Sequence, residues 1–260
     1  MTPARSERWL VWVVPVLIVG GWEWLVRSGA IPASQSAAPS DIAGRVWHLT
    51  ATGPLARHAA FSLFRIIAGV VVGTLLGVFT SAIVARWRLG DRLFSPTIQL
   101  LSGIPVVIWI PFWVMLFGTG EVFKVGMAAV ATYFLVHMHT LHAFRLVERD
   151  YAELAEMYEK SNLQRVAHVL LPFATPGIFT AIRTSMAFAW IVIFFVEYAS
   201  ARHGSEGLGW FIADARSIGR VEDEFAGLII LGMIAYGADR AVGAIQRHLL
   251  VWSDTEENID

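Results

Sequence analysis

Three histidines, His137, His139 and His142, stand close together in an apolar segment and are the residue types best suited to bind a metal. Imidazole nitrogens are common zinc ligands, but a zinc site needs three or four ligands that converge on one point. Only His139 and His142 share a helical face, and no nearby carboxylate is placed to complete such a site. We therefore predict no metal site here, and expect histidines near a membrane surface that can change protonation near neutral pH.

Several catalytic motifs are absent from the sequence. The chain has no phosphate-binding G-x-x-x-x-G-K-S/T loop, no H-E-x-x-H metalloprotease motif and no G-x-S-x-G nucleophile motif. It also has no cysteine, which excludes disulfides and thiolate chemistry. We therefore predict that the chain is not an enzyme and holds no cofactor of its own.

The composition is that of a membrane protein. Hydrophobic residues make up 56% of the 260 residues and charged residues 16%, whereas soluble domains carry about 25% charged residues. Mean hydropathy is +0.57. The net charge of −1 gives no reason to expect nucleic-acid binding.

Six segments are apolar and long enough to cross a bilayer, which takes about 20 residues. They cover about residues 9–24, 59–85, 97–117, 122–144, 173–199 and 225–250. Arg5 and Arg8 before the first segment also resemble a cleaved signal peptide, but Glu23 and the tryptophans of the segment interrupt its apolar run. With the N-terminus inside, the inner segments hold eleven Lys and Arg and the outer loops six, which favours cytoplasmic termini.

Charges inside such segments are costly and often functional, and four of the ionisable residues there stand out. Arg183 and Glu197 are read at opposite ends of the fifth segment and are candidates for pairing between helices or for a gate. Glu23 and Arg65 lie near the outer ends of the first and second segments, where snorkelling to the membrane surface explains them.

Small residues and prolines mark the second and third segments. Gly69, Gly73, Gly77 and Ser81 recur every four residues, a pattern that lets two membrane helices approach closely. The prolines of the third segment, at positions 105 and 111, each remove a backbone donor and favour a kink. Such a kink either shapes the helix bundle or forms part of a gate.

The most polar long stretch, YAELAEMYEKSNLQRVAHVLLP, lies between the fourth and fifth segments at residues 151–172. Leu154, Met157 and Tyr158 form the apolar face of a short helix, and glutamates recur every three residues beside it. An S-x-x-Q capping box at Ser161 begins a second helix, which Pro172 ends or joins to the next span. Charge alone is also typical of a solvated cytoplasmic loop.

This stretch resembles the EAA signature of permease subunits of ATP-binding-cassette importers, roughly E-A-A, three residues, G, nine residues and I-x-L-P. The chain has Glu153-Leu154-Ala155, then Glu159 at the glycine position, then V-L-L-P ending at Pro172. The spacing matches, while Leu154 and Glu159 depart from the signature. The glycine of the signature can adopt positive φ at a helix end without penalty, whereas a glutamate cannot. The turn is therefore expected either at Glu159 or at Asn162, which tolerates positive φ better.

The resemblance covers nearly the whole chain and is greatest to permeases for nitrate, taurine and aliphatic sulfonates. Residues 62–69, 103–125, 196–212 and 239–252 carry it as well. It implies an all-α integral membrane protein with the six-transmembrane-helix type I importer permease fold, with residues 1–260 as one domain and 150–172 as its coupling element. The implied ATPase-coupling residues are Glu153, Leu154, Ala155, Glu156, Met157, Tyr158, Glu159, Leu171 and Pro172.

By the same resemblance the chain is the permease subunit of an importer for a small organic anion in the bacterial inner membrane. Its implied partners are a second permease chain in a homodimer, two ATPase subunits that bind ATP and Mg, and a periplasmic or lipid-anchored binding protein. The translocation-path candidates are Pro105, Pro111, His137, Arg183, Trp190 and Glu197. The alternatives are an ATP-independent channel or secondary transporter, and a membrane metalloenzyme that uses the histidines.

Overall fold

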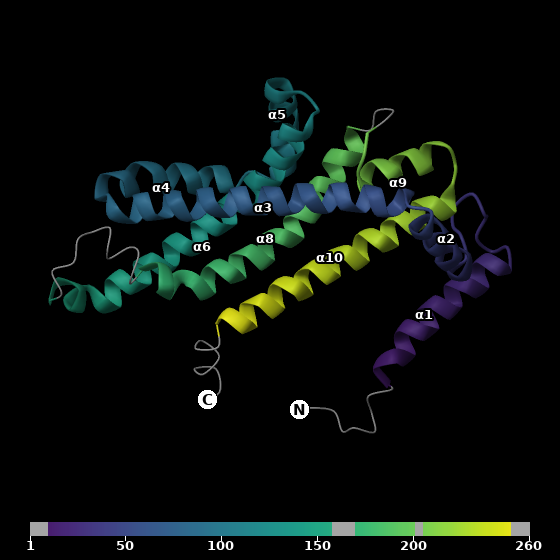
Figure 1. Cartoon of the computed structure of the whole chain (residues 1–260), viewed down its shortest axis with the longest axis horizontal. Coiled ribbons are helices and arrows are strands. Elements are labelled where there is room, and N and C mark those ends of the chain that lie inside the picture. Colours follow the sequence, from purple (N-terminus) through teal and green to yellow (C-terminus); the bar gives the residue numbers. More distant parts are fainter. Residues whose placement is uncertain (1–9, 158–169, 201–204, 251–260) are drawn as a thin grey trace. The chain divides into compact units, whose positions relative to one another are not determined.

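The computed structural model describes residues 10–157, 170–200 and 205–250, and every regular element in these ranges is a helix (Figure 1). The all-α prediction is therefore confirmed for this part of the chain. The elements are α1 (Leu10–Arg27), α2 (Pro39–Ala51), α3 (Pro54–Arg86), α4 (Arg88–Ser102), η2 (Val106–Trp109), α5 (Ile110–Phe117), α6 (Glu121–Met157), α8 (Leu171–Ala199), α9 (Leu208–Ser217) and α10 (Val221–Leu249).

Four helices are long and apolar enough to cross a membrane, namely α3, α6, α8 and α10. Residues 89–102 and 106–117 make a fifth span if they are counted together, although the two helices meet at 96°. Helix α1, which covers the first predicted span, is not among these candidates over the residues that the structure describes. The structure thus supports four to five of the six predicted spans.

The third predicted span, residues 97–117, is not one straight helix. Helix α4 ends before Gly103, and Pro105 precedes a short 3₁₀ turn that leads into α5. Pro111 lies in the first turn of α5, where its missing N–H costs no intrahelical hydrogen bond. The two prolines therefore separate helices and do not kink one continuous helix.

The chain divides into two compact units, each described by itself. The first comprises Met1–Phe61 and Ala201–Met233, and the second Ser62–Ser200 and Ile234–Asp260. In the first unit, the Gly207 N–H before α9 donates to Nδ1 of His58 at 3.2 Å. The His58 ring lies 5.2 Å from that of Trp210 and 5.5 Å from that of Phe211, which ties α9 to the start of α3.

The core of the second unit lies between α6 and α8. Phe123, Met127 and Ala131 of α6 pack with Val192 and Val196 of α8, and all five side chains are buried. The turn and helix at 106–114 cover this cluster through partly buried hydrophobic residues. The bent segment is therefore anchored to the main helix pair.

Helices α3 and α6 approach closely at the predicted small residues. A Cβ added to Gly69 would lie 2.4 Å from Cβ of Ala128, and one added to Gly73 would lie 2.5 Å from the backbone oxygen of Ala129. At Gly77 the nearest atoms of α6 would be 3.0 Å away. The predicted packing role of this glycine stripe is confirmed, because no larger side chain fits without moving the helices apart.

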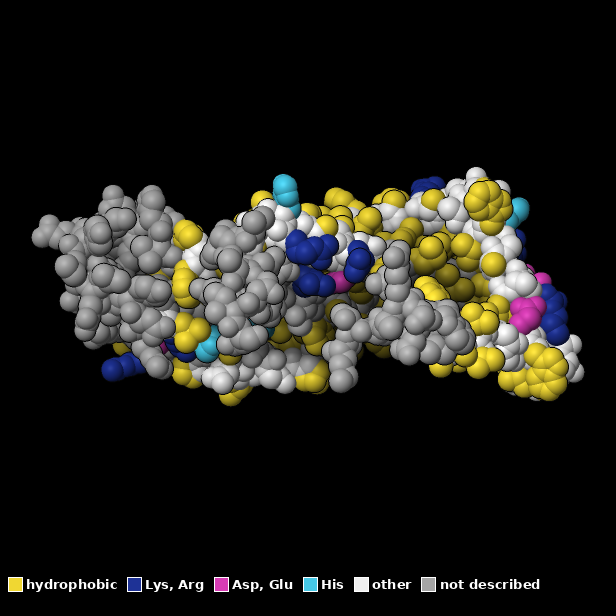
Figure 2. Space-filling view, turned by 90° about the horizontal axis from the view of Figure 1, so that it is seen from below, with side chains coloured by type: hydrophobic (Ala, Val, Ile, Leu, Met, Phe, Trp, Pro, Cys, Tyr) yellow, Lys and Arg dark blue, Asp and Glu magenta, His cyan; other side chains and the backbone are white. Residues whose placement is uncertain are grey.

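Large hydrophobic side chains are exposed along the candidate spans. On α3, Phe64 and Phe79 are each 63% exposed and Leu75 is 65% exposed. Figure 2 shows hydrophobic side chains gathered over part of the face that it presents. Such surfaces suit contact with lipid chains, which offer no polar partner.

Candidate functional site

A cluster of charges centred on a buried arginine joins three of the candidate spans. Arg65 of α3 is 1% exposed, and its Nη1 donates to Oε1 of Glu197 on α8 at 2.6 Å. Its Nε and Nη2 donate to the two carboxylate oxygens of Glu121, at the start of α6, at 2.7 and 2.6 Å. The Ser62 hydroxyl also donates to Glu197, at 2.7 Å. One guanidinium thus links α3, α6 and α8.

The same cluster balances its charges. Lys124 is buried, and its Nζ lies 3.4 Å from Oε1 of Glu121, so two cations face two carboxylates. Buried charges persist only where partners of opposite charge and hydrogen bonds satisfy them. Glu197 therefore takes part in the expected pairing between helices, whereas the snorkelling explanation of Arg65 is wrong because its side chain points into protein. Its partner Glu121 was not singled out from the sequence.

A second ion pair joins α8 to α10. Nε and Nη2 of Arg183 donate to the two carboxylate oxygens of Asp239 at 3.1 and 3.0 Å. This confirms pairing between helices for Arg183. Its expected place at one end of the fifth span is wrong, because α8 extends from Leu171 to Ala199 and Arg183 lies near its middle.

The three histidines have different surroundings. His137 is fully buried, with its Nδ1 2.9 Å from the hydroxyl of Thr80 on α3. His139 and His142 are exposed, and Nδ1 of His139 lies 2.9 Å from the backbone oxygen of Leu135. His137 therefore belongs to the contact between α3 and α6, and the expectation of histidines at a membrane surface is wrong for it.

The six translocation-path candidates occupy separate environments in this chain. Trp190 of α8 is buried, with 6% of its surface exposed, and Glu197 pairs with Arg65 in the charge cluster. Pro105 lines a cavity of about 420 Å³ with Phe134 and Phe188. Of the six, Arg183 has a charged side chain that is substantially exposed, at 41%.

The predicted coupling element is partly described. Helix α6 continues without a break from the fourth span to Met157, so the backbone of residues 153–157 extends that span. The side chains of 147–157, and Tyr158 and Glu159 altogether, lie outside the described residues. At the far end, Leu170 is buried against Phe144 and Ala174. Leu171 packs on this cluster, and Pro172 lies in the first turn of α8.

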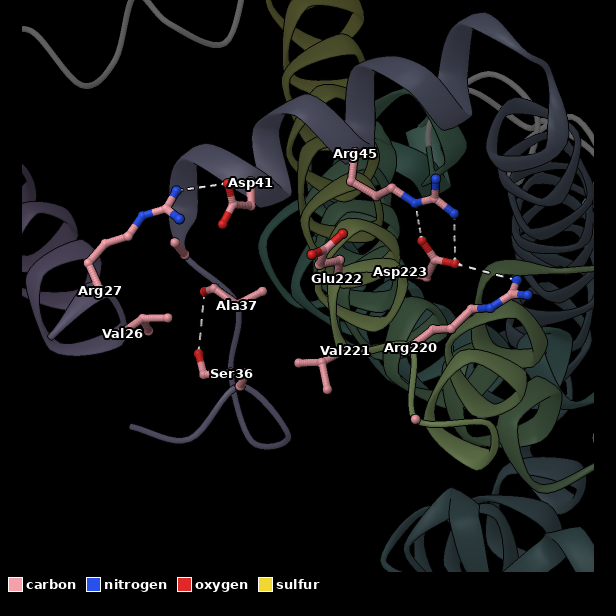
Figure 3. Close-up of a pocket in the computed structure, with 13 residues that line it drawn as sticks. Val26, Arg27, Ser36, Ala37, Asp41, Arg45, Arg220, Val221, Glu222 and Asp223 are labelled. Carbon is pink, nitrogen blue, oxygen red and sulfur yellow. Dashed lines mark hydrogen bonds and ion pairs between the residues drawn. The ribbon is translucent and has the colours of Figure 1, made fainter. Parts of the chain in front are cut away.

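A polar cleft of about 620 Å³ lies within the first unit (Figure 3). Arg45 of α2 forms an ion pair with Asp223, the third residue of α10, and Nη2 of Arg45 donates to Oδ2 of Asp223 at 3.1 Å. This hydrogen bond raises the pKa of Arg45, so the guanidinium stays charged. Arg220 faces the same carboxylate at 3.9 Å.

The other wall of the cleft is anchored by Arg27 of α1. Its Nη2 donates to Oδ1 of Asp41 at 2.8 Å, and its Nε to Glu23 at 3.0 Å. The Ser40 hydroxyl donates to the same Glu23 carboxylate at 2.8 Å. Glu23 therefore fastens α1 to the start of α2, a role that snorkelling alone did not suggest.

The charged residues inside the spans are recognisable in the sequence, but most of the residues with which they pair are not. Neither Asp239 nor Glu121 was assigned a pairing role from the sequence, and the cleft formed by Arg45 and Asp223 was not predicted. One signal was available, because an ionisable residue inside a span needs an opposite charge in another span. The sequence does not say which of several acids supplies that charge.

The geometry defines a helical, multi-pass membrane protein whose spans are fastened by internal ion pairs. Residues 54–249 match the family model described as binding-protein-dependent transport system inner membrane component. The chain belongs to this family of ABC importer permeases, whose subunits do not hydrolyse ATP themselves.

Similar proteins that align with almost the whole chain support this family assignment. The chain is 28% identical over 256 residues to a protein of Escherichia coli named as an aliphatic sulfonates transport permease, SsuC, covering 97% of this chain and 95% of that protein. Against the SsuC protein of Bacillus subtilis it is 28% identical over 245 residues, covering 94% and 88%. Against the bicarbonate transport system permease CmpB of Synechococcus elongatus it is 26% identical over 189 residues, covering 73% and 67%.

Family membership settles the class of function. The chain is a permease subunit of a binding-protein-dependent ABC importer in the inner membrane, and it works with an ATPase and a binding protein. The channel, secondary-transporter and metalloenzyme alternatives are thereby replaced.

Proposed function

We propose that the chain forms the path by which a small organic anion crosses the bacterial inner membrane. The observation that carries this proposal is the match to permeases named for aliphatic sulfonates and for bicarbonate, which are both anions. A half-exposed arginine within a span agrees with an anionic substrate, because its guanidinium pairs with oxyanions. The class includes sulfonates, taurine and nitrate-like ions.

The proposed assembly has two identical permease chains, each with the six-span type I fold over residues 1–260 and both termini in the cytoplasm. Two ATPase subunits bind ATP and Mg inside, and a periplasmic or lipid-anchored binding protein delivers the anion from outside. The four to five spans in the described part of the chain are compatible with this fold if α1 supplies another.

The coupling element is proposed to be residues 150–172. In this proposal Glu153, Leu154, Ala155, Glu156, Met157, Tyr158 and Glu159 meet the ATPase, and Leu171 with Pro172 joins the element to α8. The continuous helix from Glu121 to Met157 supports it, since a rigid rod transmits displacement better than a loop. The buried contact of Leu170 with Phe144 supports a firm attachment at the other end.

Uptake by proteoliposomes tests the substrate class. The permease is reconstituted with its ATPase, the binding protein is added outside, and labelled ethanesulfonate, taurine, nitrate and bicarbonate are compared with a neutral solute and a cation of similar size. We expect ATP-dependent uptake of one of the anions. Uptake of the neutral solute or the cation alone would contradict the proposed class.

A further inference from the structure

The ion pair between Arg183 and Asp239 uses only one edge of the arginine guanidinium. Arg183 uses Nε and Nη2 to bind both oxygens of Asp239. Its Nη1 donates no hydrogen bond within the described part of the chain. Arginine has five N–H donors in a planar fork, so a second edge remains available for an oxyanion.

The pair lies deep within its helices. Arg183 is twelve residues from the start of α8 at Leu171, about 18 Å at 1.5 Å per residue. Asp239 is ten residues from the end of α10 at Leu249, about 15 Å along that helix. Each helix has 29 residues and is about 43 Å long, more than the roughly 30 Å of a hydrocarbon core, and both groups lie well inside their helices and not at a helix end.

The pair is nevertheless exposed in the single chain. The Arg183 and Asp239 side chains are 41% and 44% exposed, and Thr180 and Thr184 are exposed on the same face of α8. A charged face of this kind cannot rest against lipid chains, and such groups in membrane proteins border water or other protein. This face of α8 and α10 is therefore not a lipid-facing surface.

A different face of the same helices is apolar. Together with α3 it forms a groove of about 580 Å³, which is lined by Ile66 and Val70 of α3, by Ile182 and Met186 of α8, and by Ile234 and Ala238 of α10. The polar groups are thus gathered on one face and separated from the apolar groove. The contrast distinguishes a surface suited to lipid from one suited to water.

Helix α10 leaves room for the guanidinium. Gly243, one turn after Asp239, is buried, and an added Cβ there would lie 3.4 Å from Cζ of Arg183. The guanidinium of Arg183 therefore packs against α10 at Gly243 and pairs with the carboxylate of Asp239. Its Nη1 donates no hydrogen bond to any residue that the structure describes.

We propose that this face borders the water-filled translocation path and that the Nη1 edge of Arg183 binds the oxyanion as it passes. The inference rests on the proposed anion permease and deepens it by naming a binding residue. Asp239 positions the guanidinium and offsets its charge. The anion is then held loosely enough to leave, as passage through a path requires.

Cysteine labelling tests the proposal directly, because the chain has no cysteine of its own. Thr184→Cys and Thr180→Cys are made separately and assembled with the ATPase and binding protein. Each is treated with the membrane-impermeant sulfonate reagent MTSES, or with the cationic MTSET, from either side and with or without ATP. Leu75→Cys, on an exposed apolar stretch of α3, is the control for a lipid-facing thiol.

We expect both threonine positions to react in at least one nucleotide state and the Leu75→Cys control to stay unlabelled. Adding Asp239→Asn removes the offsetting carboxylate, and we expect the ratio of MTSES to MTSET rates at position 184 to rise about tenfold. In the transporter without an engineered cysteine, the single substitution Arg183→Ala should raise the KM for anion uptake, with a smaller effect on the maximal rate of uptake.

Other outcomes separate this inference from the proposed function. If neither threonine position reacts in any state while ATP-driven anion uptake continues, the proposed path face is wrong and the anion permease stands. A rate ratio that does not change with Asp239→Asn would likewise overturn the role of Arg183. If no anion is taken up by the unmodified transporter, the proposed function itself fails.

Discussion

Single residues show how this chain keeps charges inside a membrane. Arg65 is buried with Glu197 and also pairs with the exposed Glu121, and these three residues come from three different spans. Burying one such charge alone would cost several kcal/mol, but a complete set of partners offsets most of that cost. The cluster therefore makes the positions of α3, α6 and α8 depend on one another.

Removing the central cation should destabilise the protein strongly. We expect Arg65→Ala to lower the free energy of unfolding by about 3–5 kcal/mol, because it leaves Glu197 buried without its cation. The matched control is Arg57→Ala on the same helix, whose ion pair with Glu206 involves a side chain 69% exposed and should cost at most about 1 kcal/mol. Thermal unfolding of the purified variants in detergent measures both.

The comparison has a clear contradicting result. Equal melting temperatures for the two variants would mean that the buried cluster does not hold the spans together. A double variant, Arg65→Met with Glu197→Gln, should recover part of the stability lost in Arg65→Ala, because it removes one of the unpaired carboxylates together with the cation.

The sequence identified the charged residues inside the spans better than it identified the residues with which they form ion pairs. Glu197 and Arg183 stood out because they interrupt apolar segments, and both pair between helices. Arg65 was misjudged because a position near a span end looks the same in the sequence whether the side chain turns to the surface or inward. That direction depends on which neighbouring helix carries the carboxylate, and a single sequence does not give it.

At the scale of the helices, small residues set the distance between α3 and α6. Gly73 faces Ala129 and Thr132 so closely that one added methyl would overlap with backbone. This spacing was readable from the sequence, since four small residues recur at intervals of four. The break at Gly103 to Pro105 was read less well, because a proline can kink a helix or start a new one.

Substituting one methyl group should show this close approach. We expect Gly73→Ala to lower the free energy of unfolding by about 1–3 kcal/mol, since the helices must separate to admit it. Gly232→Ala on α10, where an added Cβ has no atom within 4 Å, should instead stabilise by up to about 1 kcal/mol through better helix propensity. Unfolding in detergent distinguishes the two, and a stabilised Gly73→Ala variant would refute the close packing.

For the whole molecule, the polar cleft of the first unit suggests where a partner contacts the permease. It includes Gly219 to Asp223, which lie between the fifth and sixth predicted spans and therefore face outside in the proposed topology with cytoplasmic termini. Arg220 is 65% exposed beside Asp223, so its charge is available to a docking protein. Exposed charges of this kind mainly steer association and set its salt dependence.

Reversing that charge should weaken docking of the binding protein. We expect Arg220→Glu to cost about 1 kcal/mol, or roughly a fivefold loss of affinity, with a smaller dependence on salt. Binding of the purified binding protein to reconstituted transporter, measured at two ionic strengths, gives both quantities. Unchanged affinity and unchanged salt dependence would place the docking surface elsewhere.

Coupling to ATP hydrolysis is the central claim, and the ratio of substrate imported to ATP hydrolysed measures it most directly. The ratio is determined in proteoliposomes for the unmodified transporter and for Glu153→Lys, with Glu153→Gln as the milder variant. We predict that Glu153→Lys lowers the ratio at least about tenfold while the ATPase stays bound or hydrolyses ATP without transport. An unchanged ratio, with normal ATPase binding, would contradict the assignment of residues 150–172 as the coupling element.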